Sequence, residues 1–347
     1  MSKPILVIKF GSASITNKIG ELDESIISSI ARQVAVLHKT YNMVLVSSGA
    51  VAAGKRFIKD YKGTISERKA AASVGNPLLL QIYSRYFSSY DICIGQSLCE
   101  RMHFSNRDQF LQLKKTFEEL WANDIIPIAN ENDVVSNLEL KFSDNDELAT
   151  LIAVGFGAAT LIFSTSVPGV LDSNNLLISK LDLEQKDALN LAHKKKSELG
   201  LGGMVTKLTF ARLATRMGIA VIIVGLQERD NLLTALSGNT GTFCNAQTCT
   251  IPARKKWLAS GSLVTGRLQV DTGAAIAIRA RQSLLWVGVS QILDKFISGE
   301  VIEILDENMC RIALGRARIS SEMLLYKNAQ VQRNNLEIAH SDDIVVL

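Results

Sequence analysis

The residues with the clearest capacity for chemistry are a glycine-rich turn and the lysine after it, in the run Gly200-Leu201-Gly202-Gly203-Met204-Val205-Thr206-Lys207. Glycine lets backbone N–H groups approach an anion closely, a helix start adds partial positive charge, and lysine adds a full charge. The spacing differs from that of a Walker loop. The segment therefore predicts a phosphate-binding turn before a helix over 208–217, with an ordinary turn as the alternative.

Two more turns of this kind follow strand-like apolar runs. The first strand ends in Lys9-Phe10-Gly11-Ser12, and a later one ends in Ser47-Ser48-Gly49, followed by a helix-like segment over 50–58. Ligands of open α/β sheets bind at the carboxyl ends of the strands. A solvated lysine and a plain strand-to-helix turn are the alternatives, but three such turns in one chain favour a common anion site.

Polar residues gather in two further short segments, Asn130-Glu131-Asn132-Asp133 after a strand-like run and Ser143-Asp144-Asn145-Asp146-Glu147 ten residues later. Asn and Asp favour turns and helix N-caps, so Asp144 or Asp146 is expected to cap a helix that begins near Glu147. Eight carboxylate and amide groups exceed what capping needs. We therefore expect them to hold an α-ammonium group or a lysine.

In this order, the motifs resemble those of the amino acid kinase family, and the resemblance extends over essentially the whole chain. Within that family, the segments 130–133 and 202–207 resemble the members that act on glutamate. The resemblance implies an α/β fold with a mostly parallel sheet between helices. It also implies ATP-dependent phosphorylation of the side-chain carboxylate of L-glutamate, giving L-glutamyl 5-phosphate and ADP, the first step of proline biosynthesis.

The resemblance also implies roles for individual residues. Lys9 and Lys207 would stabilise the transferring phosphoryl group, and Asp146 would hold both lysines. Residues implied to bind the amino acid are Ser48, Gly49, Asn130, Asp133 and Asn145. Residues implied to bind ATP are Lys9, Gly11, Thr165, Ser166, Leu201, Gly202, Gly203, Met204, Val205, Thr206 and Lys207. Mg²⁺ would be held mainly by the nucleotide phosphates, with no protein metal site.

A carboxylate nucleophile with a pKa of about 4.3 is ionised at neutral pH and needs no general base. The histidines at 38, 103, 193 and 340 accordingly lie outside the motifs. Catalysis must instead bring two anions together, which calls for cations and oriented backbone donors.

The chain departs from the family pattern at four places. Ser166 stands where the family has Asp, which removes a carboxylate near the nucleotide and leaves nucleotide affinity and base preference open. Asn76 replaces a Gln, Ser143 a Gly, and Leu201 a Thr. None removes a charged catalytic group, so altered kinetics or a related acidic substrate remains an alternative.

The composition changes after Thr250, where short β-rich pieces replace the alternation of strands and helices. We expect a catalytic domain over 1–252, a linker over 253–262, and over 263–347 a small β-barrel that resembles PUA domains. In other proteins such domains bind RNA. Here residues 254–347 hold 12 Lys and Arg against 10 Asp and Glu, too few for a clear basic face. Arg311, Arg316 and Arg318 could still cluster around one groove, so RNA binding stays an alternative, but a role in assembly or regulation is favoured.

Length and composition indicate the number of domains, the redox environment and whether a segment could cross a membrane. A length of 347 residues with 47% hydrophobic residues suggests two domains with a sizeable core. Five cysteines without a Cys-x-x-Cys pair fit a reducing compartment, and Cys244 with Cys249 is weak evidence for zinc. The uncharged stretch 148–171 is long enough to cross a membrane, but its glycines and Pro168 predict a helix, a turn and a strand.

The start of the sequence lacks the pattern of a secretory signal, so a cytoplasmic protein is expected. The implied partners are L-glutamate and MgATP, proline as a feedback inhibitor, and further copies of the chain in a dimer or tetramer. A non-enzymatic RNA-binding or regulatory protein is the alternative of another class. The presence of both Lys9 and Lys207 argues against it, because a binding module has no need of paired phosphoryl-transfer cations.

Overall fold

The computed structural model describes residues 3–135, 144–184, 203–228, 230–249, 264–327 and 336–346. The chain forms two compact units, one of residues 1–100 with 116–249 and one of residues 101–115 with 250–347. The expected linker lies outside the described residues. The division at 252 and 263 therefore stays a prediction.

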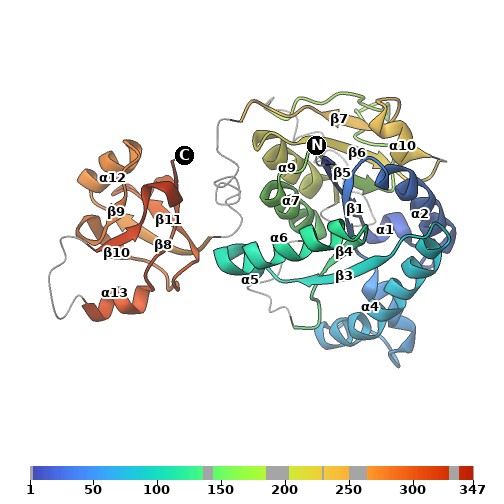
Figure 1. The fold of residues 1–347 in the computed structure, drawn as a ribbon, viewed down its shortest axis with the longest axis horizontal. Helices are drawn as coiled ribbons and strands as arrows, with labels where there is room; N and C mark the ends of the chain where they lie inside the picture. The colour runs from blue at the N-terminus through green and yellow to red at the C-terminus, as the bar shows by residue number, and fades with distance from the viewer. Residues whose placement is uncertain are drawn as a thin grey trace. The chain divides into compact units, whose positions relative to one another are not determined.

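A seven-stranded sheet forms the centre of the first unit, in the order β3-β4-β2-β1-β5-β6-β7 (Figure 1). All neighbouring strands pair parallel except β7, which runs antiparallel to β6 at one edge. The prediction of a mostly parallel α/β sheet is confirmed. The strands are β1 (Ile5–Phe10), β2 (Asn42–Ser47), β3 (Ile94–Cys99), β4 (Ile126–Glu131), β5 (Thr160–Thr165), β6 (Ala220–Gly225) and β7 (Thr242–Cys244).

Helices cover both faces of this sheet. The buried side chains of α2, α4 and α10 join those of alternate strand residues in one hydrophobic core. On the other face α7 packs against β1, β5 and α9. The helices between residues 1 and 249 are α1 (Ser12–Ile15), α2 (Glu24–His38), α3 (Ala50–Gly54), η1 (Lys55–Phe57), α4 (Ile65–Ser88), α5 (Met102–Ser105), α6 (Arg107–Ala122), α7 (Asn145–Phe156), α9 (Gly203–Arg216) and α10 (Asn231–Leu236). Of these, α5 and the first half of α6 group with the second unit.

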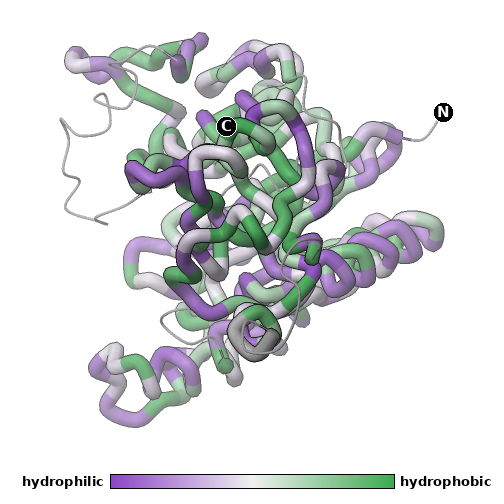
Figure 2. Tube along the Cα trace, turned by 90° about the vertical axis from the view of Figure 1, so that its left-hand side faces the viewer, coloured by the Kyte–Doolittle hydropathy of each residue, from purple (hydrophilic) through white to green (hydrophobic). Residues whose placement is uncertain are grey.

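Burial on both faces explains why the strands read as continuous apolar runs. Side chains of β1 from Leu6 to Phe10 are all buried. In Figure 2 the helices change between purple and green along their length. Most of these helices therefore keep one polar side, whereas α7 is buried along almost its whole length. Helices and strands both contribute to the core.

Helix α4 crosses α3 at very short range. A Cβ on Gly75 would lie 1.7 Å from the Ala50 carbonyl oxygen, and one on Gly54 would lie 1.9 Å from the Ala71 oxygen. Only glycine permits this approach. It seats α3, and with it the end of β2, directly on α4.

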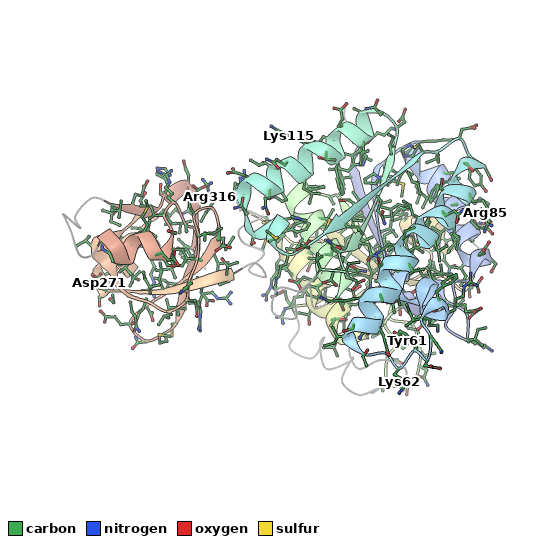
Figure 3. All side chains as sticks on the ribbon, turned by 90° about the horizontal axis from the view of Figure 1, so that it is seen from below. Tyr61, Lys62, Arg85, Lys115, Asp271 and Arg316 are labelled. Atoms are coloured by element: carbon green, nitrogen blue, oxygen red, sulfur yellow. The ribbon has the colours of Figure 1, made fainter. Side chains whose placement is uncertain are left out.

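Helix α4 is also fixed at both ends. Thr64 and Glu67 form a capping box at its start, a pairing that satisfies two otherwise unpaired donors. Near its end Arg85, labelled at the surface in Figure 3, pairs with Glu24 of α2. The long helix is therefore tied both to its own start and to a neighbouring helix.

Some predicted boundaries differ from the structure. The helix expected over 50–58 ends at Gly54 and continues as the short turn η1. The helix expected from 208 begins at Gly203, so Lys207 lies within its first turns. The uncharged stretch 148–171 forms most of α7, a turn and β5, as predicted. No helix in the described ranges is long and apolar enough to cross a membrane.

The C-terminal residues form their own sheet, in the order β10-β8-β11-β12-β14, with a second pair β13-β9. A separate core lies beneath it, so the predicted β-rich module is confirmed. Its elements are β8 (Val264–Val270), α12 (Thr272–Arg279), β9 (Leu284–Leu285), η2 (Trp286–Gly288), β10 (Val289–Ile292), β11 (Val301–Leu305), β12 (Arg311–Arg316), α13 (Ser321–Lys327), β13 (Glu337–Ala339), η4 (Ser341–Asp343) and β14 (Ile344–Val346).

Candidate active site

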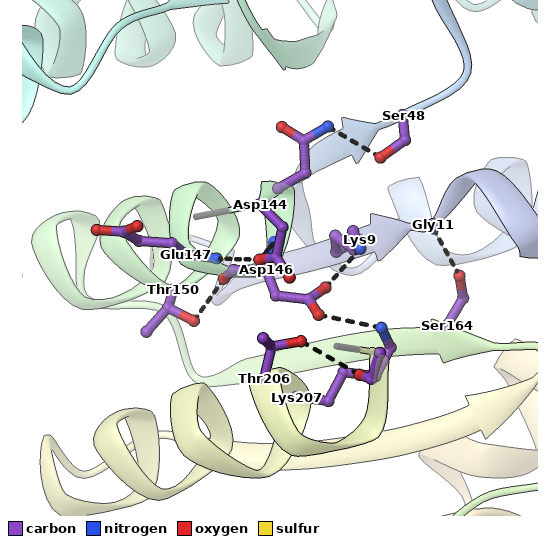
Figure 4. A network of polar contacts seen from close by, with 12 residues as sticks. Lys9, Gly11, Ser48, Asp144, Asp146, Glu147, Thr150, Ser164, Thr206 and Lys207 are labelled. Carbon is purple, nitrogen blue, oxygen red and sulfur yellow. Dashed lines mark hydrogen bonds and ion pairs between the residues drawn. The ribbon is translucent and has the colours of Figure 1, made fainter. Parts of the chain in front are cut away.

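Two lysines distant in sequence converge on one carboxylate at the centre of the first unit. Lys9 Nζ lies 2.5 Å from Asp146 Oδ1, and Lys207 Nζ lies 3.0 Å from Asp146 Oδ2. Figure 4 shows both ammonium groups directed at the same side chain. The three residues are 5%, 7% and 0% exposed, in the order Lys9, Lys207, Asp146. A buried group of this kind, with two cations and one anion, carries a net positive charge and attracts further anions.

The sheet topology explains where this group lies. Lys9 is on β1, whose neighbours are β2 on one side and β5 on the other. The chain builds the sheet outwards in both directions from β1, and ligands bind where the direction changes. The lysines therefore lie between the turns that follow β2 and β4 and those that follow β5 and β6.

Asp146 is held by the first turn of α7. The side chain of Asp144 caps that helix and accepts from the N–H groups of Asp146 and Glu147 at 2.8 and 3.2 Å. Thr150 donates to the Asp146 carbonyl oxygen at 2.8 Å. Asp144 is thus the N-cap and Asp146 is left free for the lysines, which resolves the two alternatives of the sequence.

Opposing electrostatic effects act on the pKa of Lys9. Burial lowers the pKa of Lys9, the nearby Asp146 carboxylate raises it, and the positive charge of Lys207 lowers it again. The net direction is downward. Asp146 is therefore the main group that favours the charged form of Lys9.

A second polar group lies beside the lysines and consists of hydrogen-bonded amides. Asn145 Nδ2 donates to Ser48 Oγ and to Asn130 Oδ1, both at 2.9 Å. Asn130 Nδ2 in turn donates to Asn76 Oδ1 at 3.1 Å. The turn after β2, the end of β4 and the start of α7 are thereby joined, and three of the residues expected to bind the amino acid come together.

Gly49 shapes the turn that carries Ser48. Its φ is +108°, and a Cβ there would lie 2.9 Å from Ile15 Cδ1. Both the backbone conformation and the space require glycine. Asp133 lies in the turn after β4. The segment that follows in the sequence, 136–143, is outside the described residues.

The other side of the lysines offers backbone and hydroxyl groups. Thr165 ends β5 and is buried, while Ser166 is exposed next to it. Gly203 begins α9, and a Cβ there would meet no atom of the described residues within 4 Å. Met204, Val205 and Thr206 complete the first turn of that helix. Leu201 and Gly202 lie outside the described residues, so their part in the expected phosphate turn is untested.

Some contacts at the site gave no signal in the sequence. Ser164 Oγ accepts from the Gly11 N–H at 3.2 Å and so ties β5 to the turn after β1. The sequence marks Asn76 only as a departure from the family pattern, yet its Oδ1 accepts a hydrogen bond from Asn130. Tyr83 OH and Ser47 Oγ lie 3.0 Å apart beneath the site, and burial raises the pKa of Tyr83 to about 12, so this phenol stays neutral.

Among the residues that the structure describes, no group of three or more His, Cys, Asp or Glu side chains is placed to hold a metal ion. The lysine–aspartate group suits phosphate oxygens instead.

Comparison with known proteins adds to this geometry. The model of the amino acid kinase family matches residues 4–225, and the PUA domain model matches residues 266–338. Glutamate 5-kinase of Haemophilus influenzae (strain PittEE) is 34% identical over 369 residues, covering 100% of both chains. Glutamate 5-kinase of Klebsiella pneumoniae (strain 342) is 36% identical over 330 residues, covering 92% of this chain and 90% of its own.

A solved structure shares the fold of the first unit. Carbamate kinase from Giardia lamblia, bound to AMP-PNP, superposes with a TM-score of 0.52 at 18% identity, covering 71% of this chain and 99% of its own.

Proposed function

Because the chain belongs to the amino acid kinase family, we propose that it transfers the γ-phosphoryl group of ATP to the side-chain carboxylate of L-glutamate, the first step of proline biosynthesis. The products are L-glutamyl 5-phosphate and ADP. The glutamate 5-kinases that match over the full length support this assignment. The observation that carries it is the convergence of Lys9 and Lys207 on buried Asp146.

The chemistry needs charge neutralisation more than proton transfer. A glutamate carboxylate oxygen forms the new bond to phosphorus while the bond to the bridging oxygen of ADP breaks, and the electron pair leaves with ADP. Lys9 and Lys207 would stabilise the negative charge on the transferring group. Asp146 would keep the ammonium groups in place before the substrates arrive, and so limit the reorganisation that the reaction requires.

The amides beside the lysines are proposed to bind glutamate by its α-ammonium and α-carboxylate groups. Ser48 Oγ accepts from Asn145, so its own proton remains available to a carboxylate. Asp133 is proposed as a further contact because a carboxylate pairs well with an ammonium group. The side-chain carboxylate of glutamate would then extend towards Lys9.

ATP is proposed to lie on the side of β5 and α9. The N-terminus of α9 offers backbone N–H groups and partial positive charge to the phosphates. Mg²⁺ bound to those phosphates would neutralise part of their charge. Ser166, where the family has Asp, is proposed to alter nucleotide affinity or base preference.

The C-terminal unit is proposed to act in assembly or regulation rather than in RNA binding. Five of its arginines already pair with carboxylates, as Arg316 does with Asp343 at 2.7 Å (Arg316 is labelled in Figure 3). The others are Arg267, Arg279, Arg311 and Arg318. Paired arginines offer little charge to a phosphate backbone, whose binding depends on free cations. A homo-oligomer is the proposed assembly.

Proline is proposed as a competitive inhibitor because its ammonium and carboxylate groups match the α end of glutamate. A cytoplasmic location is proposed because MgATP and free glutamate are supplied there.

The test is an ADP-release assay on the purified full-length protein. Initial rates are compared with L-glutamate, L-aspartate, N-acetyl-L-glutamate and carbamate at saturating MgATP. We expect ADP release that depends on L-glutamate. Release with one of the other acceptors and none with glutamate would favour a related carboxylate kinase, and none with any acceptor would refute the proposal.

A further inference from the structure

The amide side chains beneath the proposed glutamate site form a chain with a fixed direction. It runs from Asn76, inside α4, through Asn130 at the end of β4 to Asn145 at the start of α7, and it ends at Ser48. Asn76 and Asn130 are buried, 5% and 4% exposed. Each member touches the next, so the orientation of one amide constrains the others.

One backbone group sets that orientation. The Glu131 N–H donates to the Asn130 side chain at 2.9 Å. A backbone N–H can only donate, so the atom that it meets must be Oδ1. The Nδ2 of Asn130 then faces Asn76, which must present its oxygen. Asn145 must present its own Nδ2 to Asn130 Oδ1, and it shares that NH₂ group with Ser48.

This arrangement leaves one acceptor unused. Asn145 Oδ1 is buried and has no hydrogen-bond partner among the described residues. A buried carbonyl oxygen without a donor is costly, and the cost is removed when a ligand supplies one. The unused atom is an acceptor, so the group that it fits is an N–H donor such as the α-ammonium group of an amino acid.

We propose that Asn76 is a positioning residue which, through Asn130, holds the Asn145 carbonyl oxygen towards the substrate and so selects acceptors that carry a free α-ammonium group. This inference rests on the proposed function and adds its basis of selectivity. Asn76 does not contact the substrate itself and acts on it through Asn130 and Asn145. Without the Asn76 oxygen, Asn130 loses one of the three hydrogen bonds that fix its side-chain amide.

The cavity beside Asn76 can supply a partner for its side-chain NH₂ group. Asn76 Nδ2 is also buried and has no hydrogen-bond partner among the described residues. Asn76, Ser47, Tyr83 and Gln96 line a cavity of about 10 Å³, which is the space that one water needs. A water there would accept from Asn76 Nδ2, with the Tyr83 hydroxyl group as a neighbour.

The test compares Asn76→Leu, which removes the acceptor and keeps a branched side chain of the same length, with Asn76→Asp, which keeps an acceptor oxygen. Tyr83→Phe is the matched control, because it deletes a buried polar atom from the same cavity but leaves the amide chain intact. For each variant, kcat and KM are measured with L-glutamate, with glutarate, which lacks the ammonium group, and with MgATP. Circular dichroism establishes that each variant is folded.

We expect wild-type kcat/KM to favour glutamate over glutarate by roughly 10²-fold or more, because the site leaves an acceptor unpaired when the donor is missing. Asn76→Leu should lower this ratio by roughly tenfold or more, mainly through the glutamate KM, with the MgATP KM unchanged. Asn76→Asp and Tyr83→Phe should leave the ratio near its wild-type value, because both keep an acceptor for Asn130 Nδ2.

Two results would overturn the inference: a folded Asn76→Leu variant with the wild-type ratio, or wild-type protein that uses glutarate as well as glutamate. The second result applies even if Asn76→Leu does not fold. Failure of the proposed function is a different outcome, namely wild-type protein that releases no ADP with glutamate.

Discussion

Replacing Asp146 by Asn is the sharpest perturbation of the proposed site. The change keeps the size and shape of the side chain but removes the one negative charge between Lys9 and Lys207. Asp146 is 0% exposed and lies 2.5 and 3.0 Å from the two ammonium groups. The variant therefore leaves two buried cations without their counter-ion.

The magnitude follows from the geometry. Unit charges about 3 Å apart attract by about 5 kcal/mol at an effective dielectric constant of about 20. Removing one partner of a buried pair costs about 3–5 kcal/mol of folding stability. Loss of lysine placement should also lower kcat by about 10²–10³-fold, the usual effect of losing one stabiliser of transition-state charge.

The pH dependence gives an independent readout. Burial already lowers the pKa of Lys9, and Asp146 opposes that shift, so the pKa should fall further in Asp146→Asn. The protonated lysine is the active form, so the decline of kcat at alkaline pH should move to lower pH. Between the lowered pKa of Lys9 in the folded protein and about 10.4, its value in the unfolded chain, Lys9 is protonated mainly in the unfolded chain. The free energy of unfolding should therefore rise with pH across this window. The window is wider in Asp146→Asn because the folded-state pKa is lower.

The assays are kcat against pH by ADP release and thermal unfolding of both proteins against pH. Thr150→Val is the control, since it removes a side-chain bond to the Asp146 backbone and keeps the carboxylate. A folded Asp146→Asn protein with near-wild-type kcat and an unshifted alkaline limb would refute the reasoning.

Four further predictions test other parts of the account. Lys207→Ala should lower kcat by about 10²-fold or more; near-normal turnover in steady-state kinetics would exclude its role. Asp133→Ala should raise the glutamate KM far more than the MgATP KM and weaken inhibition by proline, whereas equal rises would indicate a structural effect. Gly75→Ala would place a Cβ 1.7 Å from a backbone oxygen of α3, so thermal unfolding should show a loss of about 1–3 kcal/mol, and an unchanged melting temperature would contradict the close crossing. A protein ending at Ala259 should keep kinase activity. Residues 101–115 group with the C-terminal unit, so the truncation can expose apolar surface, and solubility is measured first. A truncated protein that is soluble and folded but inactive would contradict the proposed division.

The parallel sheet could be predicted because its strands are buried on both faces. Apolar runs such as 5–8 and 219–224 need no alternation there, and each ends in a turn with glycine or hydroxyl residues. The edge strand β7 gave no comparable signal, since it is only three residues long. The antiparallel pairing of β7 with β6 is a contact between distant parts of the chain, and the periodicity of a sequence does not indicate such contacts.

The sequence predicted that Asp146 lies with Lys9 and Lys207, but not the contacts that hold these residues in place. The polar cluster at 144–147 indicated both a cap and a lysine partner, yet which aspartate does which depends on the residue where α7 begins. Asn76 lies in the middle of a helix and Ser164 in a buried strand, where one small polar residue has no distinctive pattern. Their partners are set by how helices and strands pack, so only the structure reveals them.

The most direct measurement of the central claim is to trap the product. Wild-type protein is incubated with MgATP, L-glutamate and hydroxylamine, which converts an acyl phosphate to a hydroxamate, and ADP and hydroxamate are measured together. The account predicts equal amounts of γ-glutamyl hydroxamate and ADP, both abolished in Lys207→Ala. ADP without hydroxamate, or no ADP that depends on glutamate, would contradict phosphoryl transfer to the glutamate side chain.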